Sequence, residues 1–288
     1  MRLGFYIDES LEISWIKRIF PDVEFQKWSP SAINMSIRLY KEKNMTPIII
    51  RLDNTCIKFV KTTIMYTKTS TPFEVIHLSD EYGTDDLSWY NLKILTKIYR
   101  NYIYPRKISE FPPESINKIY LFPLGPLIFN DIYDVTQPIH TRTFLWSFSG
   151  RLAVTYRNYQ ITSYLDFGPH KLFFYNNFMD EKRKSKDEYI EELLTSKCVA
   201  ILPGSNLETY RLYEALEFGA IPIYLRFTKD DTLYFEFLKK ILPELKDIKN
   251  PKDIFKLSDD ELELYRQKLL MSWTNVKKNP FVALSEFL

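Results

Sequence analysis

The sequence predicts an α/β fold, in which helices pack on parallel β-sheets. The clearest observation is a strand–turn–helix–turn–strand pattern over residues 198–225. A second is that short apolar runs alternate with amphipathic stretches through the first half of the chain. The third is size, because 288 residues with 45% hydrophobic content suit one large core or two medium ones.

The pattern at 198–225 predicts a βαβ unit. The apolar run 198–202 has the length of a buried strand, and Pro203 ends it. Ser205 or Asn206 is expected to cap the helix that follows, with Glu208 completing a capping box. An apolar strand resumes after the helix, and two strands joined in this way are parallel.

The polar residues of this helix suggest a binding site. Arg211 and Glu214 are three residues apart and share one helix face. A helix N-terminus at the end of a parallel strand attracts anions, so Arg211 is expected to hold a phosphate. Glu214 is placed to accept hydrogen bonds from two sugar hydroxyls. On spacing alone, an ordinary surface Arg–Glu pair remains an equal alternative.

The first half of the chain alternates strands with helices. Strands are expected at 3–7, 23–28, 47–52, 73–78 and 118–123, and helices at 11–20, 29–43 and 89–99. Asp80 and Glu81 directly follow the apolar run at 73–78. Functional groups collect past the carboxyl ends of parallel strands, so these acids are candidates. The alternative is a solvated acidic turn.

In the second half, strands are expected at 142–148 and 171–175, with helices at 152–165, 231–242 and 259–272. Another helix is expected to begin within the charged run 180–188 and to end over 189–196. Gly150 is expected at the turn after the first of these strands, where a glycine lets the backbone approach a phosphate. Arg151 adds a fork of donors beside it. A structural turn with an exposed arginine is the alternative. The interdomain linker is placed at 130–141.

Three segments carry a resemblance to a known family. Residues 208–223, Glu-Thr-Tyr-Arg-Leu-Tyr-Glu-Ala-Leu-Glu-Phe-Gly-Ala-Ile-Pro-Ile, resemble the C-terminal signature of exostosin-type glycosyltransferases. Within these they are most similar to the ribitol-xylosyltransferase-like branch. His-Leu-Ser-Asp-Glu at 77–81 and Tyr-Arg-Asn-Tyr at 99–102 extend the similarity. The resemblance implies a GT-B fold, with two Rossmann-like domains facing each other across a cleft.

The resemblance also implies different roles for the two domains. Residues 1–135 would form the acceptor-binding domain and 136–288 the nucleotide-sugar domain, with 280–288 crossing back to the first. In the family, the glutamate matching Glu214 binds the ribose, and the arginine matching Arg211 lies near the diphosphate. The expected donor-binding residues are Gly150, Arg151, Pro203, Gly204, Ser205, Asn206, Thr209, Tyr210, Arg211 and Glu214.

The implied reaction is an inverting transfer from a uridine diphosphate (UDP) sugar to a hydroxyl of a glycan, with protein-linked N-glycans among the acceptors. UDP-xylose is the favoured donor, and UDP-glucuronate and UDP-galactose remain open. Such a transfer needs one general base. Asp80 is the first candidate, Glu81 the second and Asp8 the third. The alternative function is a non-catalytic nucleotide-sugar or glycan-binding partner subunit of a glycosyltransferase complex.

Composition and missing motifs narrow the function. A net charge of +2 gives no electrostatic case for nucleic acid. The sequence has no Asp-x-Asp motif, so no metal is expected and arginines must neutralise the diphosphate. Cys56 and Cys198 are expected as reduced thiols. Without a signal peptide or membrane span, the chain is expected to be soluble and cytoplasmic, similar in type to enzymes that large algal viruses encode.

Overall fold

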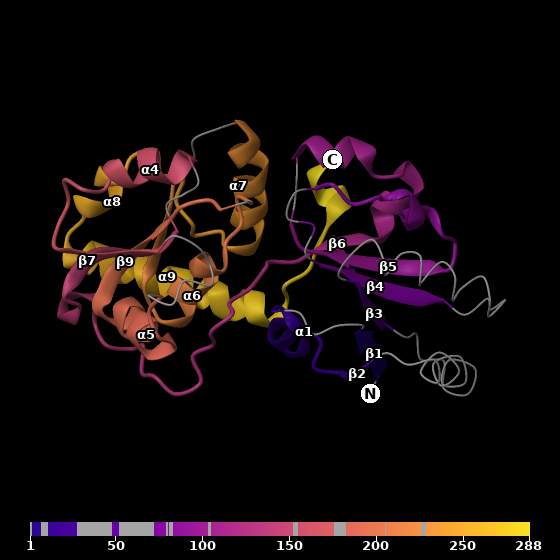
Figure 1. Cartoon of the computed structure of the whole chain (residues 1–288), viewed down its shortest axis with the longest axis horizontal. Helices are drawn as coiled ribbons and strands as arrows, with labels where there is room; N and C mark the ends of the chain where they lie inside the picture. Colours follow the sequence, from indigo (N-terminus) through magenta and orange to yellow (C-terminus); the bar gives the residue numbers. More distant parts are fainter. Residues whose placement is uncertain are drawn as a thin grey trace. The chain divides into compact units, whose positions relative to one another are not determined.

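A computed structural model describes residues 2–6, 11–27, 48–51, 72–78, 80, 83–102, 105–151, 155–175, 183–204, 206–225 and 229–288. The chain divides into two compact units (Figure 1). Unit 1 comprises Met1–Leu124 together with Asn279–Leu288, and unit 2 is Gly125–Lys278. Both units are α/β with parallel sheets, as expected for Rossmann-like domains.

Unit 1 contains a seven-stranded sheet in the order β11-β6-β5-β4-β3-β1-β2 (Figure 1). Its strands are β1 (Arg2–Tyr6), β2 (Val23–Lys27), β3 (Ile48–Arg51), β4 (Phe73–His77), β5 (Leu95–Arg100), β6 (Ile119–Leu121) and β11 (Val282–Ala283). Strands β1 to β6 pair in parallel, and β11 pairs antiparallel with β6 at one edge. Every residue of β4 is buried, as a central parallel strand requires.

Within the described residues, the helical elements of unit 1 are short. They are α1 (Ile13–Ile19) and the 3₁₀ helices η1 (Ser88–Asn91), η2 (Pro105–Glu110), η3 (Pro113–Lys118) and η5 (Leu284–Phe287). Helix α1 buries Trp15, Ile16 and Ile19 on one face. The Trp15 indole donates to the carbonyl of Pro123 over 2.8 Å, which ties this helix to the end of β6.

One predicted helix of unit 1 is wrong. Residues 89–99 form the end of η1, a turn and most of β5. The run Leu95-Thr-Lys-Ile-Tyr-Arg100 contains β-branched and aromatic residues that favour a strand, and β5 is held between β4 and β6. The helix expected at 29–43 lies outside the described residues.

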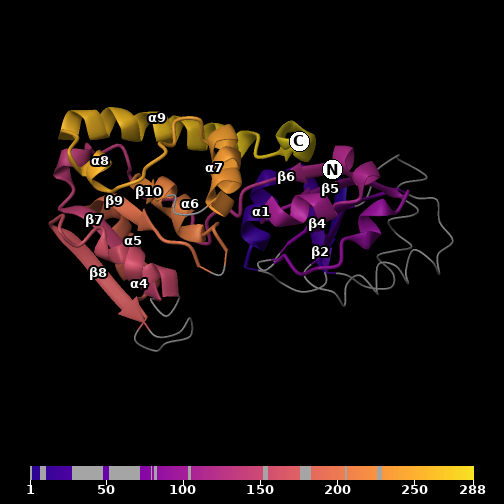
Figure 2. The ribbon, with the colours of Figure 1, turned by 90° about the horizontal axis from the view of Figure 1, so that it is seen from above.

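Unit 2 contains a four-stranded parallel sheet in the order β10-β9-β7-β8. The strands are β7 (Phe144–Arg151), β8 (His170–Tyr175), β9 (Ser196–Ile201) and β10 (Ile221–Tyr224). The helices are η4 (Ile139–Thr141), α4 (Thr155–Thr162), α5 (Lys186–Thr195), α6 (Tyr210–Glu217), α7 (Lys229–Ile241), α8 (Lys252–Phe255) and α9 (Asp259–Lys278). The longest helix, α9, packs on α6 and α7 (Figure 2).

The βαβ unit is confirmed as β9-α6-β10, with Cys198 paired to Ile221. Its predicted cap is wrong, because α6 begins after Thr209, whose side chain makes no capping bond. Asn206 instead accepts the N–H of Glu208 over 2.9 Å and shapes the turn before the helix. Glu208 precedes the first helical residue, so it does not close a capping box, and it accepts a hydrogen bond from the Tyr213 hydroxyl.

None of the helices within the described residues has the length and apolarity needed to cross a membrane. Helix α9 is the longest, but charged side chains occur along it, and its apolar residues Leu264 and Met271 are exposed while Leu262, Leu269 and Trp273 are buried.

Candidate functional site

Three arginine side chains lie near the carboxyl end of β7 in unit 2. We call Arg151, Arg157 and Arg211 the arginine cluster. Arg151 is the last residue of β7, Arg157 lies in α4, and Arg211 is in the first turn of α6. Arg157 donates from Nη1 to the carbonyl of Arg151 over 2.8 Å. The guanidinium carbons of Arg157 and Arg211 lie 6.0 and 4.5 Å from the centre of the Phe148 ring.

Arg211 is held by the strand next to it. Its Nη2 donates to the carbonyl of Ser149, and its guanidinium stacks on Phe148. Its Nε is buried and has no hydrogen-bond partner in the described part of the chain. The guanidinium therefore retains one unsatisfied donor that could form a hydrogen bond to an anionic ligand.

Gly150 makes room for this arrangement. It lies inside β7, not at the predicted turn, because the pairing with β8 continues to Arg151. A Cβ added to Gly150 would lie 2.7 Å from Arg211 Nη2 and 2.9 Å from Phe148 Cζ. The glycine is therefore required by the arginine that packs over it.

Arg157 joins the ends of two strands. Beyond its bond to Arg151, it donates from Nε to the Pro203 carbonyl over 2.7 Å and from Nη2 to the Leu202 carbonyl over 3.3 Å. Burial, together with the charges of Arg211 and Arg151, lowers the pKa of Arg157 to about 10. Within the described residues, no carboxylate forms an ion pair with any arginine of the cluster. The cluster is therefore a local excess of positive charge.

Glu214 is buried one turn after Arg211 in α6. It accepts the Tyr189 hydroxyl over 2.8 Å and the backbone N–H groups of Leu127 and Ile128. Burial raises the pKa of Glu214, while the bond from Tyr189 and the charge of Arg211 oppose that rise. The Arg211–Glu214 proximity confirms the face predicted from their spacing.

The loop between β9 and α6 carries the remaining predicted donor-binding residues, which are Pro203, Gly204, Ser205, Asn206, Thr209 and Tyr210. A Cβ on Gly204 would lie 3.0 Å from Arg157 Nη2, so this loop packs closely on the arginine cluster. Asn206 is buried, and Thr209 Oγ1 is buried without a hydrogen-bond partner in the described chain. Ser205 lies outside the described residues.

Sequence reasoning missed Arg157 and Tyr189. Arg157 lies on the helix that follows β7, six residues after Arg151. That position near the end of a parallel strand could have identified it as a candidate phosphate-binding residue. Tyr189 approaches Glu214 only through packing, so nothing in its own sequence context identified it.

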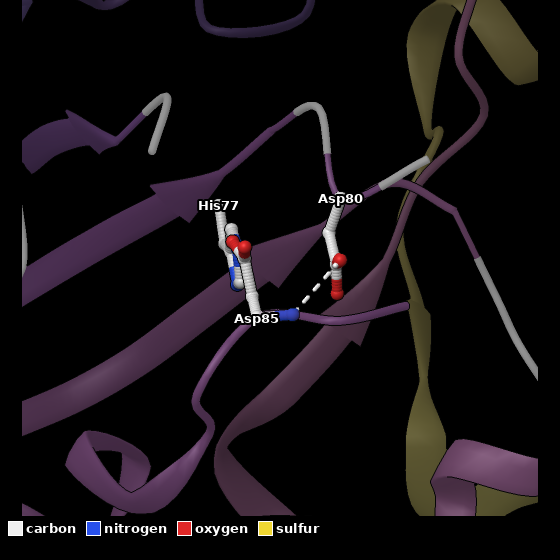
Figure 3. Close-up of side chains that lie close together, drawn as sticks. All are labelled: His77, Asp80 and Asp85. Atoms are coloured by element: carbon white, nitrogen blue, oxygen red, sulfur yellow. Dashed lines mark hydrogen bonds and ion pairs between the residues drawn. The ribbon is translucent and has the colours of Figure 1, made fainter. Parts of the chain in front are cut away.

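A second polar cluster lies in unit 1, at the carboxyl end of β4. His77 is the last residue of β4, and Asp80 and Asp85 follow in the next loop (Figure 3). Parallel pairing sets His77 beside Arg100 of β5. With Tyr90 of η1, these residues form a connected network that we call the acid–histidine cluster.

Asp80 uses both carboxylate oxygens inside the protein. Its Oδ2 accepts Arg100 Nη2 over 2.5 Å, and its Oδ1 accepts the N–H groups of Thr84 and Asp85 over 2.8 and 3.2 Å. Its side chain is nearly inaccessible to solvent. Asp80 therefore anchors the loop, while the other predicted bases, Glu81 and Asp8, lie outside the described residues.

The contacts of His77 fix its tautomer. Its Nδ1 lies 2.6 Å from the Tyr90 hydroxyl and 3.2 Å from Arg100 Nη1. A guanidinium only donates, so Nδ1 accepts and Nε2 carries the hydrogen. Nε2 then donates to Asp85 Oδ2 over 2.7 Å.

The ligand atoms of His77, Asp80 and Asp85 lie within 4.8 Å of one another, a spacing that a metal ion can use. Arg100, however, already contacts Asp80 over 2.5 Å and His77 over 3.2 Å. A divalent cation between these groups would be repelled by the guanidinium. The residues present therefore fit a metal poorly.

Comparison with known protein families gives a match that lies within unit 2. No curated protein matches the sequence. A family model does match a segment that includes Tyr189, Arg211 and Glu214, although this segment is less than half of the chain. Residues 171–276 match the RXYLT1 C-terminal domain, which supports a ribitol-xylosyltransferase-like family for this part of the sequence.

Proposed function

We propose that this chain is an inverting glycosyltransferase that moves xylose from UDP-xylose to a hydroxyl of a glycan acceptor. The observation that carries the proposal is the arginine cluster beside buried Glu214, with Arg211 and Glu214 inside the segment that matches the RXYLT1 C-terminal domain. In glycosyl transfer from a nucleotide-sugar, the arginine cluster would bind the diphosphate and Glu214 would bind the ribose.

The arginine cluster suits a diphosphate. Arg151, Arg157 and Arg211 repel one another, and a bound diphosphate would relieve that repulsion. The unsatisfied Nε of Arg211 offers it one further donor. The N-terminus of α6, which follows the end of a parallel strand, adds a favourable dipole. Glu214 would accept ribose hydroxyls next to its bond from Tyr189.

The reaction follows from these assignments, in a GT-B arrangement with the donor on unit 2 and the acceptor on unit 1. A carboxylate of the loop after β4 takes the proton of the acceptor hydroxyl. The acceptor oxygen attacks the anomeric carbon, and the bond from that carbon to UDP breaks. The arginine cluster stabilises the charge that develops on the departing diphosphate.

Binding is tested by thermal unfolding with a panel of UDP-, GDP- and CMP-sugars. UDP-xylose at about one hundred times its dissociation constant should add about 2.7 kcal/mol to the free energy of unfolding. Arg211→Ala should reduce the shift at the same ligand concentration to about half or less. Arg18→Ala is the matched control, because Arg18 is exposed on α1 in unit 1. If no UDP-sugar shifts the wild-type transition at millimolar concentration, the proposed donor is wrong.

Transfer itself is tested with UDP-xylose and a panel of methyl glycosides and ribitol 5-phosphate, with products detected by mass spectrometry. Transfer should persist in excess EDTA, because the arginines neutralise the diphosphate without a divalent cation. Activity lost in EDTA and restored by manganese would contradict that part of the proposal. UDP-xylose binding with neither transfer nor slow release of UDP would instead indicate a non-catalytic partner subunit.

A further inference from the structure

We propose that Asp85 is the catalytic carboxylate of unit 1, and that His77 and Asp80 are positioning residues that hold it. This inference rests on the proposed glycosyl transfer and names the group that receives the acceptor proton. It differs from the sequence prediction, which ranked Asp80 first, Glu81 second and Asp8 third and did not include Asp85.

Accessibility separates the three candidates of the acid–histidine cluster. The exposed fraction of the side chain is 14% for Asp85, 3% for Asp80 and 0% for His77. A general base must come within hydrogen-bond reach of the hydroxyl that it deprotonates. Among these residues, Asp85 has the most exposed side chain and is therefore the one that an acceptor hydroxyl can best approach.

The charge next to each carboxylate also differs. Arg100 faces Asp80 directly, so the positive guanidinium neutralises that carboxylate. Asp85 Oδ2 accepts a hydrogen bond from the Nε2–H group of His77 over 2.7 Å. Among the described contacts, Asp85 is therefore oriented by an imidazole, whereas Asp80 is held directly by a guanidinium.

The loop is built around Asp80 in a way that fixes Asp85. Gly83 donates its N–H to the Asp80 carbonyl over 3.1 Å, and Thr84 and Asp85 donate theirs to the Asp80 carboxylate. Figure 3 shows the last of these bonds, with the Asp85 carboxylate turned toward His77. Asp80 thus places the backbone of Asp85, and His77 places its side chain.

In the proposed step, each bond that forms is matched by a bond that breaks, and the proton is passed on to the solvent. The proton of the acceptor hydroxyl passes to Asp85 as the acceptor oxygen bonds to the anomeric carbon of the donor. The bond between that carbon and the β-phosphate oxygen breaks, and its electron pair leaves with UDP. Asp85 then releases the proton to solvent.

The test compares Asp85→Asn with Asp86→Asn, using UDP-xylose and whichever acceptor of the panel the wild type uses. The asparagine at 85 keeps an oxygen that accepts the His77 bond but cannot take a proton. Turnover should fall by about a hundred- to ten-thousandfold, with UDP affinity and melting temperature unchanged. Asp86 accepts the N–H of Ser88 and is exposed, so its variant should transfer at the wild-type rate.

The positioning role of His77 is tested by a pair of substitutions. His77→Gln keeps an N–H donor for Asp85, whereas His77→Phe removes it. Turnover should fall further in the second variant, with little change in the KM for UDP-xylose. Equal losses in both would overturn this role, because a purely packing function does not distinguish the donor.

Two outcomes separate the inference from the function on which it rests. An active wild type with a fully active Asp85→Asn variant would overturn the Asp85 assignment alone. A wild type that transfers sugar to no acceptor of the panel would overturn the proposed function, whatever Asp85 does. A drop in turnover that is matched by a drop in melting temperature or in UDP affinity would make Asp85 a structural residue.

Discussion

Replacing Gly150 by alanine should weaken UDP binding through Arg211. The added Cβ would lie 2.7 Å from Arg211 Nη2 and 2.9 Å from Phe148 Cζ, closer than a Cβ atom approaches other heavy atoms in folded proteins. The Phe148 ring is fully buried and cannot yield easily, so the guanidinium must leave the Ser149 carbonyl. The arginine then no longer occupies the position from which it would bind a phosphate.

The size of the effect follows from the bond that is lost. A hydrogen bond to a charged group contributes about 1.5–3 kcal/mol, so UDP affinity should fall roughly ten- to 150-fold. Overpacking against Phe148 should also lower the free energy of unfolding by about 1–3 kcal/mol. Titration calorimetry with UDP and urea unfolding measure the two losses separately.

A double-mutant cycle tests whether Arg211 transmits the effect. Gly150→Ala, Arg211→Ala and the double variant are titrated with UDP under identical conditions. If Gly150 acts through Arg211, the double variant binds UDP as weakly as Arg211→Ala alone. Losses that add would refute this reasoning and indicate that the Gly150 backbone itself contacts the diphosphate.

Three further substitutions or treatments test individual contacts. Burial raises the pKa of Glu214 above its ordinary 4.5, so native stability should fall as pH rises from about 4.5 through the raised value. Glu214→Gln should flatten that part of the pH profile of the melting temperature, and a profile equal to wild type would contradict the assignment. Asp80→Asn leaves Arg100 buried without its carboxylate and should cost about 3–5 kcal/mol in urea unfolding; a loss below 1 kcal/mol would show that Arg100 finds another partner. Burial raises the pKa of the Cys198 thiol to about 12, so iodoacetamide at about pH 8 should label it only after unfolding. Peptide mapping distinguishes Cys198 from Cys56, and a labelled Cys198 in the native protein would contradict its burial.

The sequence was most informative where the determinants of structure are local. The β9-α6-β10 unit and the shared face of Arg211 and Glu214 depend on residues within one short segment. Local patterns also placed the other strands of unit 2, although β7 extends three residues beyond its predicted end. That extension moved Gly150 from a turn into a strand and changed its role.

The sequence was least informative where register and tertiary packing decide. The strand β5 was predicted as a helix because its apolar residues also fit a helical repeat, and only pairing with β4 and β6 resolves the ambiguity. The same pairing brings Arg100 beside His77, which determines the charge around Asp80. No local pattern contains that information, so the choice of Asp80 as the first candidate base rested on its place in the chain alone, and Asp85 was not among the candidates.

The short strand β11 makes unit 2 an insertion within unit 1. The chain leaves unit 1 after Leu124 and returns at Asn279, and only then does Val282–Ala283 pair with the edge of β6. During synthesis, this edge would therefore stay open until all of unit 2 had been made. An open strand edge invites pairing with other chains, so removal of 279–288 should promote aggregation even though the acid–histidine and arginine clusters contain none of these residues.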